Sequence, residues 1–442
     1  MKIPFWKSNK QSDEIKSANE AENSSKNRSA AQIAEKIGHY FNPEPQKEKV
    51  LRHEDFQAAG DVYYASVSAM YKIAQRILCV LLVAFLLISI LTNYREITYD
   101  NFFYLIKDFS SAVDADSTNY ETLSYDSDSR HQFALYRGGL AIVNPSSVSA
   151  FSATGRRTLR LTSDFSSPFV VTSDQYLLAY DTSGTTFSVY TSFSKVYTET
   201  KDYPITDACF ASDNSFVVVS RSDRSKAVIY SYSKNFKPQA EMRYSYYLLD
   251  VALNSDNNQM VSVGYDNGEG IGRTMISLRE YPFVEENGAD VYMDLAVDGE
   301  FPLACGFLEN GRIAVITDSA IRIYDNDLEE IQSQSYSEKS VRGFHISSQG
   351  AAVSTVYASQ NEIIAFDRLG NLLYHDFVAS NVTEVGVYGD IIFLKVENGV
   401  IRLTAQNGKE ERLPSGDGKL LLYNDKTVLV CGEAKAEYLV FD

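Results

Sequence analysis

Very few residues of this chain have both the type and the spacing that catalysis or metal binding requires. Its four cysteines form no C-x-x-C pair, and its five histidines are scattered without a zinc-type spacing. We interpret His131, His345 and His375 as hydrogen-bonded structural histidines. Cys209 and Cys305 occupy equivalent places in two apolar segments, which favours buried free thiols over a disulfide. The sequence therefore predicts no catalytic residue, no cofactor and no metal site.

The segment "GYDNGEGIGR" (Gly264–Arg273) combines four glycines with two acids, a composition that could surround a phosphate. A phosphate-binding loop would need Gly-Lys-Ser or Gly-Lys-Thr between a strand and a helix, whereas this segment joins two expected strands. We interpret it as a hairpin loop on one face of the domain, where loops often contact partners. The candidate contact residues are Asp266, Asn267, Glu269 and Arg273.

The charge of the chain limits its partners. A formal net charge of −17 argues against nucleic acid, because phosphate binding requires a basic surface. The acidic segment Ser111–Arg130 lacks the glycine and the distal glutamate of a calcium loop, so no calcium site is predicted there. Asp325 and Asp367 follow expected strands and resemble turn-capping acids.

A repeated pattern indicates the elements that must position these residues. Apolar alternating runs that end in an aromatic residue or leucine recur about every 40 residues. Their end points are Phe151, Tyr190, Tyr232, Leu278, Tyr324, Phe366, Leu403 and Phe441. A second series of continuous apolar runs precedes the first, as expected of strands covered on both faces. With a further strand before each pair and a weaker one after it, the unit is typical of a β-propeller blade.

The number of units predicts an all-β fold, a β-propeller over residues 120–442 with eight blades. Seven blades is the runner-up, if the first or seventh unit is degenerate. A β-sandwich is the main alternative, but it gives no reason for a long-range period. The last unit has only three strands of its own. We expect Tyr120–Ser127 to supply the fourth, because an open ring would leave unpaired sheet edges.

One segment departs from the all-β pattern. Ile77–Leu91 is an uncharged apolar run, and tyrosines extend it to residues 71–94, against the roughly 20 residues that a bilayer core requires. We predict a single transmembrane helix there, with a buried core helix as the alternative. It would follow a disordered cytoplasmic tail (1–70) and precede a neck with a short amphipathic helix (95–119).

Charge favours one orientation of this helix. Residues 1–76 hold 12 Lys and Arg against 10 Asp and Glu, whereas the rest of the chain is strongly acidic. The positive-inside tendency therefore predicts a cytoplasmic N-terminus and an extracellular C-terminal domain at the cell membrane.

The repeats resemble those of YVTN-type, WD40-like and quinoprotein-like propellers in pattern, without a Trp-Asp dipeptide or a Gly-His start. The layout of lysine-rich tail, late apolar segment, "EITYDNFFYLIKD" and propeller is similar to a Firmicutes family of single-pass membrane proteins of unknown function. This resemblance implies a bacterial envelope protein and brings no known activity. Quinoprotein dehydrogenases resemble the chain in period only, because their blade-docking tryptophans and vicinal cysteine pair are absent.

These observations predict a membrane-anchored, extracytoplasmic propeller that acts as a non-catalytic binding or scaffold module. The expected partner is another protein or a cell-wall polymer. An envelope lyase or hydrolase that uses acidic residues is the alternative, and it predicts carboxyl groups of perturbed pKa near the centre of the propeller. A transmembrane sensor that signals through the N-terminal tail is a second alternative.

Overall fold

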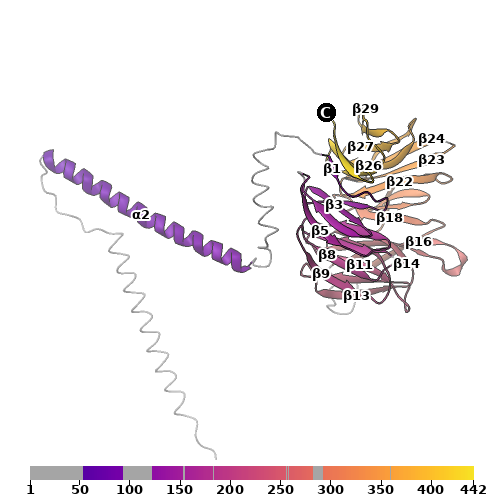
Figure 1. Cartoon of the computed structure of the whole chain (residues 1–442), viewed down its shortest axis with the longest axis horizontal. Helices are drawn as coiled ribbons and strands as arrows, with labels where there is room; N and C mark the ends of the chain where they lie inside the picture. Colours follow the sequence, from indigo (N-terminus) through magenta and orange to yellow (C-terminus); the bar gives the residue numbers. More distant parts are fainter. Residues whose placement is uncertain are drawn as a thin grey trace, which may run out of the picture. The chain divides into compact units, whose positions relative to one another are not determined.

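The computed structural model describes residues 53–92, 122–152, 155–182, 184–254, 256, 258–281, 292–358 and 360–442. The chain divides into two units, Met1–Ile97 and Thr98–Asp442. The described part of the first unit is a helix, α2 (His53–Thr92), and the second unit is built of strands (Figure 1). Most of the predicted tail and all of the predicted neck lie outside the described residues.

The helix α2 contains the apolar run Ile77–Leu91 that the sequence predicts to cross a membrane. Successive apolar side chains such as Val80, Leu81 and Leu82 are all exposed. Among the residues that were described, no helix meets the length and apolarity that a membrane crossing requires. The transmembrane helix over 71–94 therefore stays a prediction.

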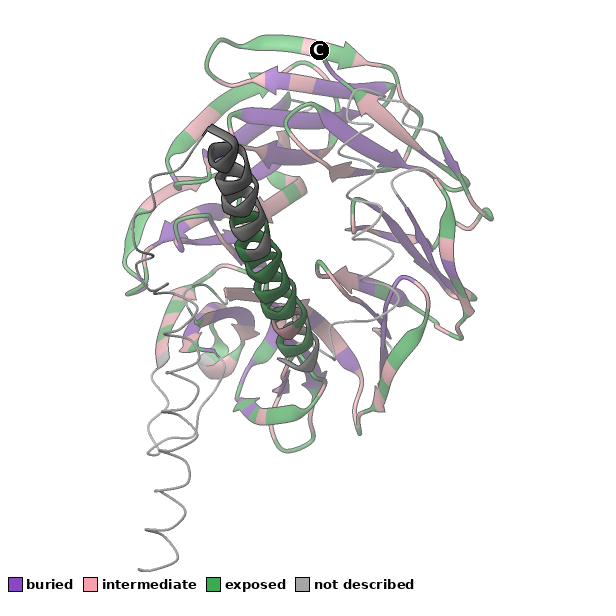
Figure 2. Cartoon of the chain, turned by 90° about the vertical axis from the view of Figure 1, so that its left-hand side faces the viewer, coloured by how far each residue is buried: buried purple, intermediate pink, exposed green. Residues whose placement is uncertain are grey.

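In the described part of the second unit, 32 strands form eight four-stranded antiparallel sheets. Figure 2 shows that the sheets radiate around a common axis as the blades of a propeller. Seven sheets take their four strands in chain order, and the eighth combines the last three strands with the first. The prediction of an all-β propeller with eight blades is confirmed, and the sandwich alternative is wrong.

The blades have the following strands, from the axis outward. Blade 1 has β2 (Gln132–Tyr136), β3 (Gly139–Asn144), β4 (Ser147–Phe151) and β5 (Arg157–Thr162); blade 2 has β6 (Pro168–Thr172), β7 (Leu177–Asp181), β8 (Thr186–Tyr190) and β9 (Lys195–Thr200); blade 3 has β10 (Ile205–Phe210), β11 (Phe216–Arg221), β12 (Ala227–Tyr232) and β13 (Pro238–Tyr244); blade 4 has β14 (Tyr247–Asn254), β15 (Gln259–Asp266), β16 (Arg273–Glu280) and β17 (Tyr292–Asp298).

The second half of the ring follows the same plan. Blade 5 has β18 (Pro302–Phe307), β19 (Ile313–Thr317), β20 (Ala320–Tyr324) and β21 (Glu330–Ser335); blade 6 has β22 (Ser340–Ser347), β23 (Gly350–Tyr357), β24 (Gln360–Asp367) and β25 (Leu372–Val378); blade 7 has β26 (Val382–Tyr388), β27 (Ile391–Val396), β28 (Gly399–Thr404) and β29 (Lys409–Leu413); blade 8 has β30 (Lys419–Leu422), β31 (Thr427–Cys431), β32 (Lys435–Val440) and β1 (Leu123–Ser124).

The core lies between neighbouring sheets, which explains the apolar runs of the sequence. Every residue of β27 is buried, whereas exposed and half-buried residues alternate in the outer strand β9. Phe187 of blade 2 packs against Phe216 of blade 3, whose ring stacks on Tyr232 with ring centroids 4.6 Å apart. Second and third strands thus bury both faces, and the outer strands only one.

The ring is closed by β1, which pairs antiparallel with β32 at Leu123↔Ala436 and Ser124↔Lys435. Leu123 is buried, and the Tyr125 hydroxyl donates to the Gly432 carbonyl (2.7 Å). The closing strand thus lies within Tyr120–Ser127 and is shorter than that segment. It completes blade 8 and leaves no gap in the ring of sheets.

The strand order defines two faces of the propeller. The face that carries the turns between second and third strands and the links between blades is here called the connection face. The opposite face carries the turns between first and second and between third and fourth strands, and is called the hairpin face. Each blade contributes loops to both.

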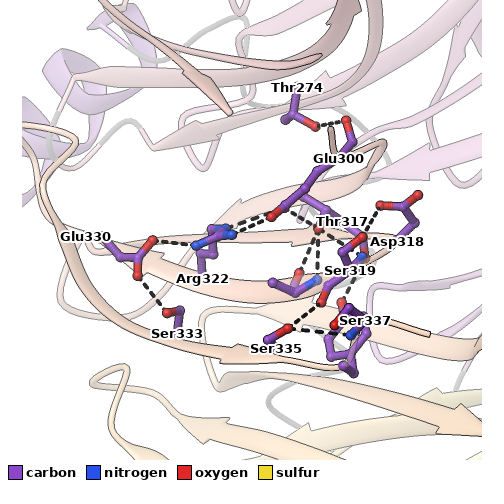
Figure 3. Close-up of polar contacts among 12 residues, drawn as sticks. Thr274, Glu300, Thr317, Asp318, Ser319, Arg322, Glu330, Ser333, Ser335 and Ser337 are labelled. Carbon is purple, nitrogen blue, oxygen red and sulfur yellow. Dashed lines mark hydrogen bonds and ion pairs between the residues drawn. The ribbon is translucent and has the colours of Figure 1, made fainter. Parts of the chain in front are cut away.

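A charged cluster fixes the link between blades 4 and 5 (Figure 3). Glu300, in the link, receives hydrogen bonds from the Arg322 guanidinium of β20 and from the Thr317 hydroxyl (2.7 Å). The Thr274 hydroxyl of blade 4 donates to its main-chain carbonyl (2.8 Å). Arg322 also donates to Glu330 (2.7 Å), so the guanidinium bridges two acids. Burial alone would lower the pKa of Arg322, but its two acidic partners raise it.

Candidate functional site

The predicted partner loop is the turn between β15 and β16, on the connection face of blade 4. Asp266 pairs with Lys226 (3.2 Å), and Arg273 lies 3.9 Å from Asp298, so both charges are engaged at the base of the hairpin. The hydrogen bond from Lys226 is the main reason that the pKa of Asp266 is lowered. Asn267 is exposed, and the Glu269 side chain lies outside the described residues.

An apolar residue that the sequence analysis left out lies at the tip of this loop. Ile271 is 55% exposed, and the short 3-10 helix η1 (Gly268–Gly270) precedes it. Gly270 has a φ of +83°, which favours glycine. A Cβ at Gly272 would lie 2.0 Å from the Tyr265 hydroxyl, so a larger residue there would displace the tyrosine ring. Glycine thus shapes a turn that presents an isoleucine, not a phosphate site.

The two faces differ in the kind of apolar residue that they expose. In the described part of the propeller, the exposed aromatic residues are Phe169, Tyr247, Phe301, Phe344, Tyr357 and Phe377. Phe344 lies within the innermost strand β22, and the other five lie at strand ends or links on the connection face. The exposed aliphatic residues of the propeller, apart from Ile271, lie on the hairpin face and are Val196, Ile331, Leu369, Leu372 and Val440. The connection face therefore carries the aromatic surface.

Acidic residues at the axis tie neighbouring blades together. At three blade junctions, a carboxyl beside a β-bulge of an innermost strand accepts a main-chain N–H from the innermost strand of the next blade. The bonds run from Val251 N to Asp207 Oδ2 (3.1 Å), from Cys305 N to Asp250 Oδ2 (2.8 Å) and from Leu420 N to Glu384 Oε2 (2.7 Å). Each carboxyl thus links the innermost strands of two neighbouring blades.

The pKa values of Asp207 and Asp250 are perturbed upward. The residues as wholes are half-buried, whereas their carboxyl groups are enclosed by neighbouring strands. Burial raises the pKa of Asp250 to about 6. Burial and the adjacent Asp250 raise the pKa of Asp207 well above its usual value. Such acids near the centre were the feature expected of an enzyme, although main-chain donors occupy their oxygens here.

A pocket of about 410 Å³ opens on the hairpin face next to the axis, between the turns of blades 3 to 6. Cys209 of β10 and Cys305 of β18 both line it, with blade 4 between their strands. Both are free thiols, as predicted. Burial, reinforced by the nearby aspartates, raises the pKa of Cys209 to about 12 and raises that of Cys305. The thiolates are therefore disfavoured, and neither cysteine has the character of a nucleophile.

The histidines do not converge on a site. His345 shares a hydrogen bond with Ser347 of its own strand (3.2 Å), and burial lowers its pKa to about 4. His375 lies 2.9 Å from Glu362 of the same blade, and His131 Nε2 lies 2.8 Å from the Asp126 carbonyl. Each of the three histidines thus has one hydrogen-bonded ring nitrogen, as predicted, whereas the buried Nδ1 of His131 has no partner in the part of the chain that the structure describes. Among the described residues no group of three or more metal-binding side chains occurs.

Three solved structures match the chain at low identity. The WD40 domain of Pan2 from Neurospora crassa is 9% identical with a TM-score of 0.44, and the match covers 62% of this chain and 88% of that one. BamB from Moraxella catarrhalis is 13% identical with a TM-score of 0.48 (72% and 100% covered). Apo AztD from Citrobacter koseri is 11% identical with a TM-score of 0.48 (69% and 91% covered).

No curated protein matches the chain. A family model matches residues 114–413, which comprise blades 1 to 7 and the closing strand β1. Because this match covers more than half of the chain, the protein belongs to the family described as "Family of unknown function (DUF5711)".

Proposed function

We propose that this chain is a non-catalytic binding module of a bacterial cell envelope, anchored in the membrane by its apolar helix, and that its connection face binds a protein partner. The segregation of exposed aromatic residues carries the proposal. On the connection face, Tyr247 lies in blade 4, which also presents Ile271, Phe301 lies in the link to blade 5, and Tyr357 and Phe377 lie in blade 6. Aromatic residues are enriched at the energetic centres of protein interfaces.

The membrane anchor is supported by the side chains of α2. From Val80 to Val83 four successive apolar residues are exposed, so they occupy more than one face of the helix. A helix that is apolar on all sides requires an apolar environment. With the sequence charge bias, we propose that the N-terminus is cytoplasmic and the propeller extracellular. Protease treatment of intact cells should remove a C-terminal epitope tag and spare an N-terminal one; the reverse result would contradict this orientation.

The bonds of the axial acids support a binding role over hydrolysis. A general acid or nucleophile must have an oxygen free for substrate. Asp207 and Asp250 accept four main-chain hydrogen bonds between them, from Ala208, Val251 (which donates to both) and Cys305. The carboxyl oxygens of Asp207 and Asp250 thus hold neighbouring strands together, and we propose no catalytic residue.

Photo-crosslinking in cells tests the binding face. A photoreactive residue at Ile271 should yield discrete adducts with one protein, whereas the same residue at Leu369 (44% exposed, hairpin face) should not. The adduct at Ile271 should disappear in the double variant Phe301→Ser, Tyr357→Ser. Equal adducts from both faces, or adducts from Leu369 alone, would contradict the proposal.

A further inference from the structure

Two of the three axial acids, Asp207 and Asp250, lie side by side, whereas Glu384 has no acidic neighbour of this kind in the described part of the ring. Asp207 of β10 and Asp250 of β14 occupy the same register position in blades 3 and 4, each beside a bulge. The Val251 N–H donates to both, at 3.1 Å to Asp207 Oδ2 and 3.0 Å to Asp250 Oδ1. Two oxygens that share one donor must be neighbours. We refer to Asp207 and Asp250 as the dyad.

The surroundings of the dyad do not offer it a cation. The titratable groups that face it are the Tyr180 hydroxyl from β7, which lies 3.5 Å from Asp207, and the thiols of Cys209 from β10 and Cys305 from β18. All three are neutral at physiological pH, because burial raises their pKa values. Two ionised carboxylates in contact without a positive charge repel each other strongly.

We infer that the dyad holds one proton in the folded chain, bridging the two carboxyl groups, and that loss of this proton loosens the axial junction of blades 3 to 5. The hydrogen bond from one aspartate to the other is the interaction that the proton supplies. Asp250, with a pKa of about 6, is the first of the pair to ionise, and burial and Asp250 raise the pKa of Asp207 well above its usual value, so the pair still holds one proton at neutral pH.

Loss of the shared proton would change the shape of the pocket on the hairpin face. Cys209 lies two residues after Asp207, and Cys305 donates its N–H to Asp250, and both cysteines line that pocket. If repulsion within the dyad separates β10, β14 and β18, the pocket opens between the same strands. The pocket walls are thus linked to pH through the dyad, and a ligand of this pocket would bind with proton release or uptake.

Glu384 provides a matched control within the same ring. It occupies the equivalent position in blade 7 and accepts the Leu420 N–H of blade 8, but the charges that bear on it are the cations Lys419 and Lys395. Cys431, in blade 8 near Glu384, is a buried thiol whose pKa burial also raises. Cys431 lies in the second strand β31 and not in an innermost strand like Cys209, but it too is a buried thiol near an axial acid, here without a second acid.

Thiol labelling of the full-length chain tests the inference. Two variants each retain a single cysteine, Cys209 or Cys431, with the other three replaced by alanine. At alkaline pH, where the wild-type pair loses its shared proton, we expect Asp207→Asn to slow the labelling of Cys209 by roughly tenfold, because the junction stays closed, and to leave Cys431 unchanged. A static pocket gives the opposite result. Removal of the Asp207 charge would favour the Cys209 thiolate and speed its labelling, and that outcome would overturn the inference.

Infrared spectroscopy provides a second readout that does not depend on opening. At pH 7 the wild-type chain should show a carboxylic-acid C=O band that is absent from both Asp207→Asn and Asp250→Asn and present in Glu384→Gln. Loss of the band from only one of the two aspartate variants, or its absence from the wild type, would show that the proton is not shared. This measurement applies to the wild type even if a variant fails to fold.

Discussion

Two acidic clusters in neighbouring blades are both enclosed by protein, but their carboxyl groups are stabilised in different ways. Glu300, in the link between blades 4 and 5, is 13% exposed and is paired with the Arg322 guanidinium, which also binds Glu330. The dyad at the axis of blades 3 and 4 has no cation, and its two carboxyls face each other. In one cluster an arginine stabilises the ionised acids, and in the other a proton does so.

The difference reflects the space around each cluster and not the axis as such, because the axial Glu384 of blade 7 has two lysines nearby. The link between blades 4 and 5 runs close to the second and third strands of blade 5. A long side chain from the third strand, Arg322, therefore reaches Glu300 in this link. At the axis the innermost strands approach so closely that a Cβ at Gly343 would lie 3.0 Å from the Thr383 carbonyl of the next blade. A proton needs no such space. We therefore expect opposite pH dependences from the two clusters.

The largest loss of unfolding free energy is expected when the Arg322 cation is removed. Arg322→Met leaves Glu300 enclosed without its partner, and breaking a buried pair in this way costs about 3–5 kcal/mol. Chemical denaturation of the full-length chain should show this loss in the free energy of unfolding. Arg322→Lys keeps the charge but not the bidentate geometry, so its loss should be smaller. A loss below about 1 kcal/mol for Arg322→Met would mean that the two clusters do not differ as described.

Much of this architecture could be predicted from the sequence, because the second and third strands are buried on both faces. Tyr232, Tyr324 and Phe366 are all at most 1% exposed, and such a constraint leaves a periodic apolar pattern. The outer strands bury one face only and gave a weaker pattern. The two-residue strand β1 could be located only through the missing fourth strand of blade 8.

The dyad was not predicted, since Asp207 and Asp250 are 43 positions apart and polar residues are common near strand ends. A signal was nevertheless present, because "ITDACF" and "LLDVAL" align with an acid inside an apolar first strand. Ile271 was missed for another reason. The candidate contact residues of its loop were all charged or amide residues, whereas Ile271, a large exposed side chain at the tip, is apolar.

The next effect concerns the high-pH side of the stability profile. The folded-state pKa of Asp250 is about 6, above its usual value, so the folded state binds more protons and loses stability as pH rises through about 6. The loss should be roughly 1.4 kcal/mol between pH 5 and 8. Asp250→Asn should flatten this part of a plot of unfolding free energy against pH. An unchanged slope in that variant would assign the effect to another group.

A smaller effect of opposite sign is expected from blade 6, where Glu362 binds Lys339 (2.6 Å) and His375. Burial alone would raise the pKa of Glu362, but these hydrogen bonds lower it. Its contribution is therefore present above the usual glutamate pKa and is lost as pH falls below it. Glu362→Gln should remove about 1 kcal/mol of the acid-side decline between pH 5 and 3. A steeper acid-side decline in this variant would contradict the assignment.

The smallest effect is expected from Glu384, which is half-buried as Asp250 is but has lysines as neighbours. Burial raises the pKa of Glu384, whereas the Leu420 N–H and two lysines lower it. Its alkaline contribution should therefore have the same sign as that of Asp250 but less than half the size. Thermal unfolding of Glu384→Gln and Asp250→Asn, measured side by side from pH 5 to 8, gives the ratio. Equal slopes would contradict this expectation and would show that the two lysines do not offset the burial of Glu384.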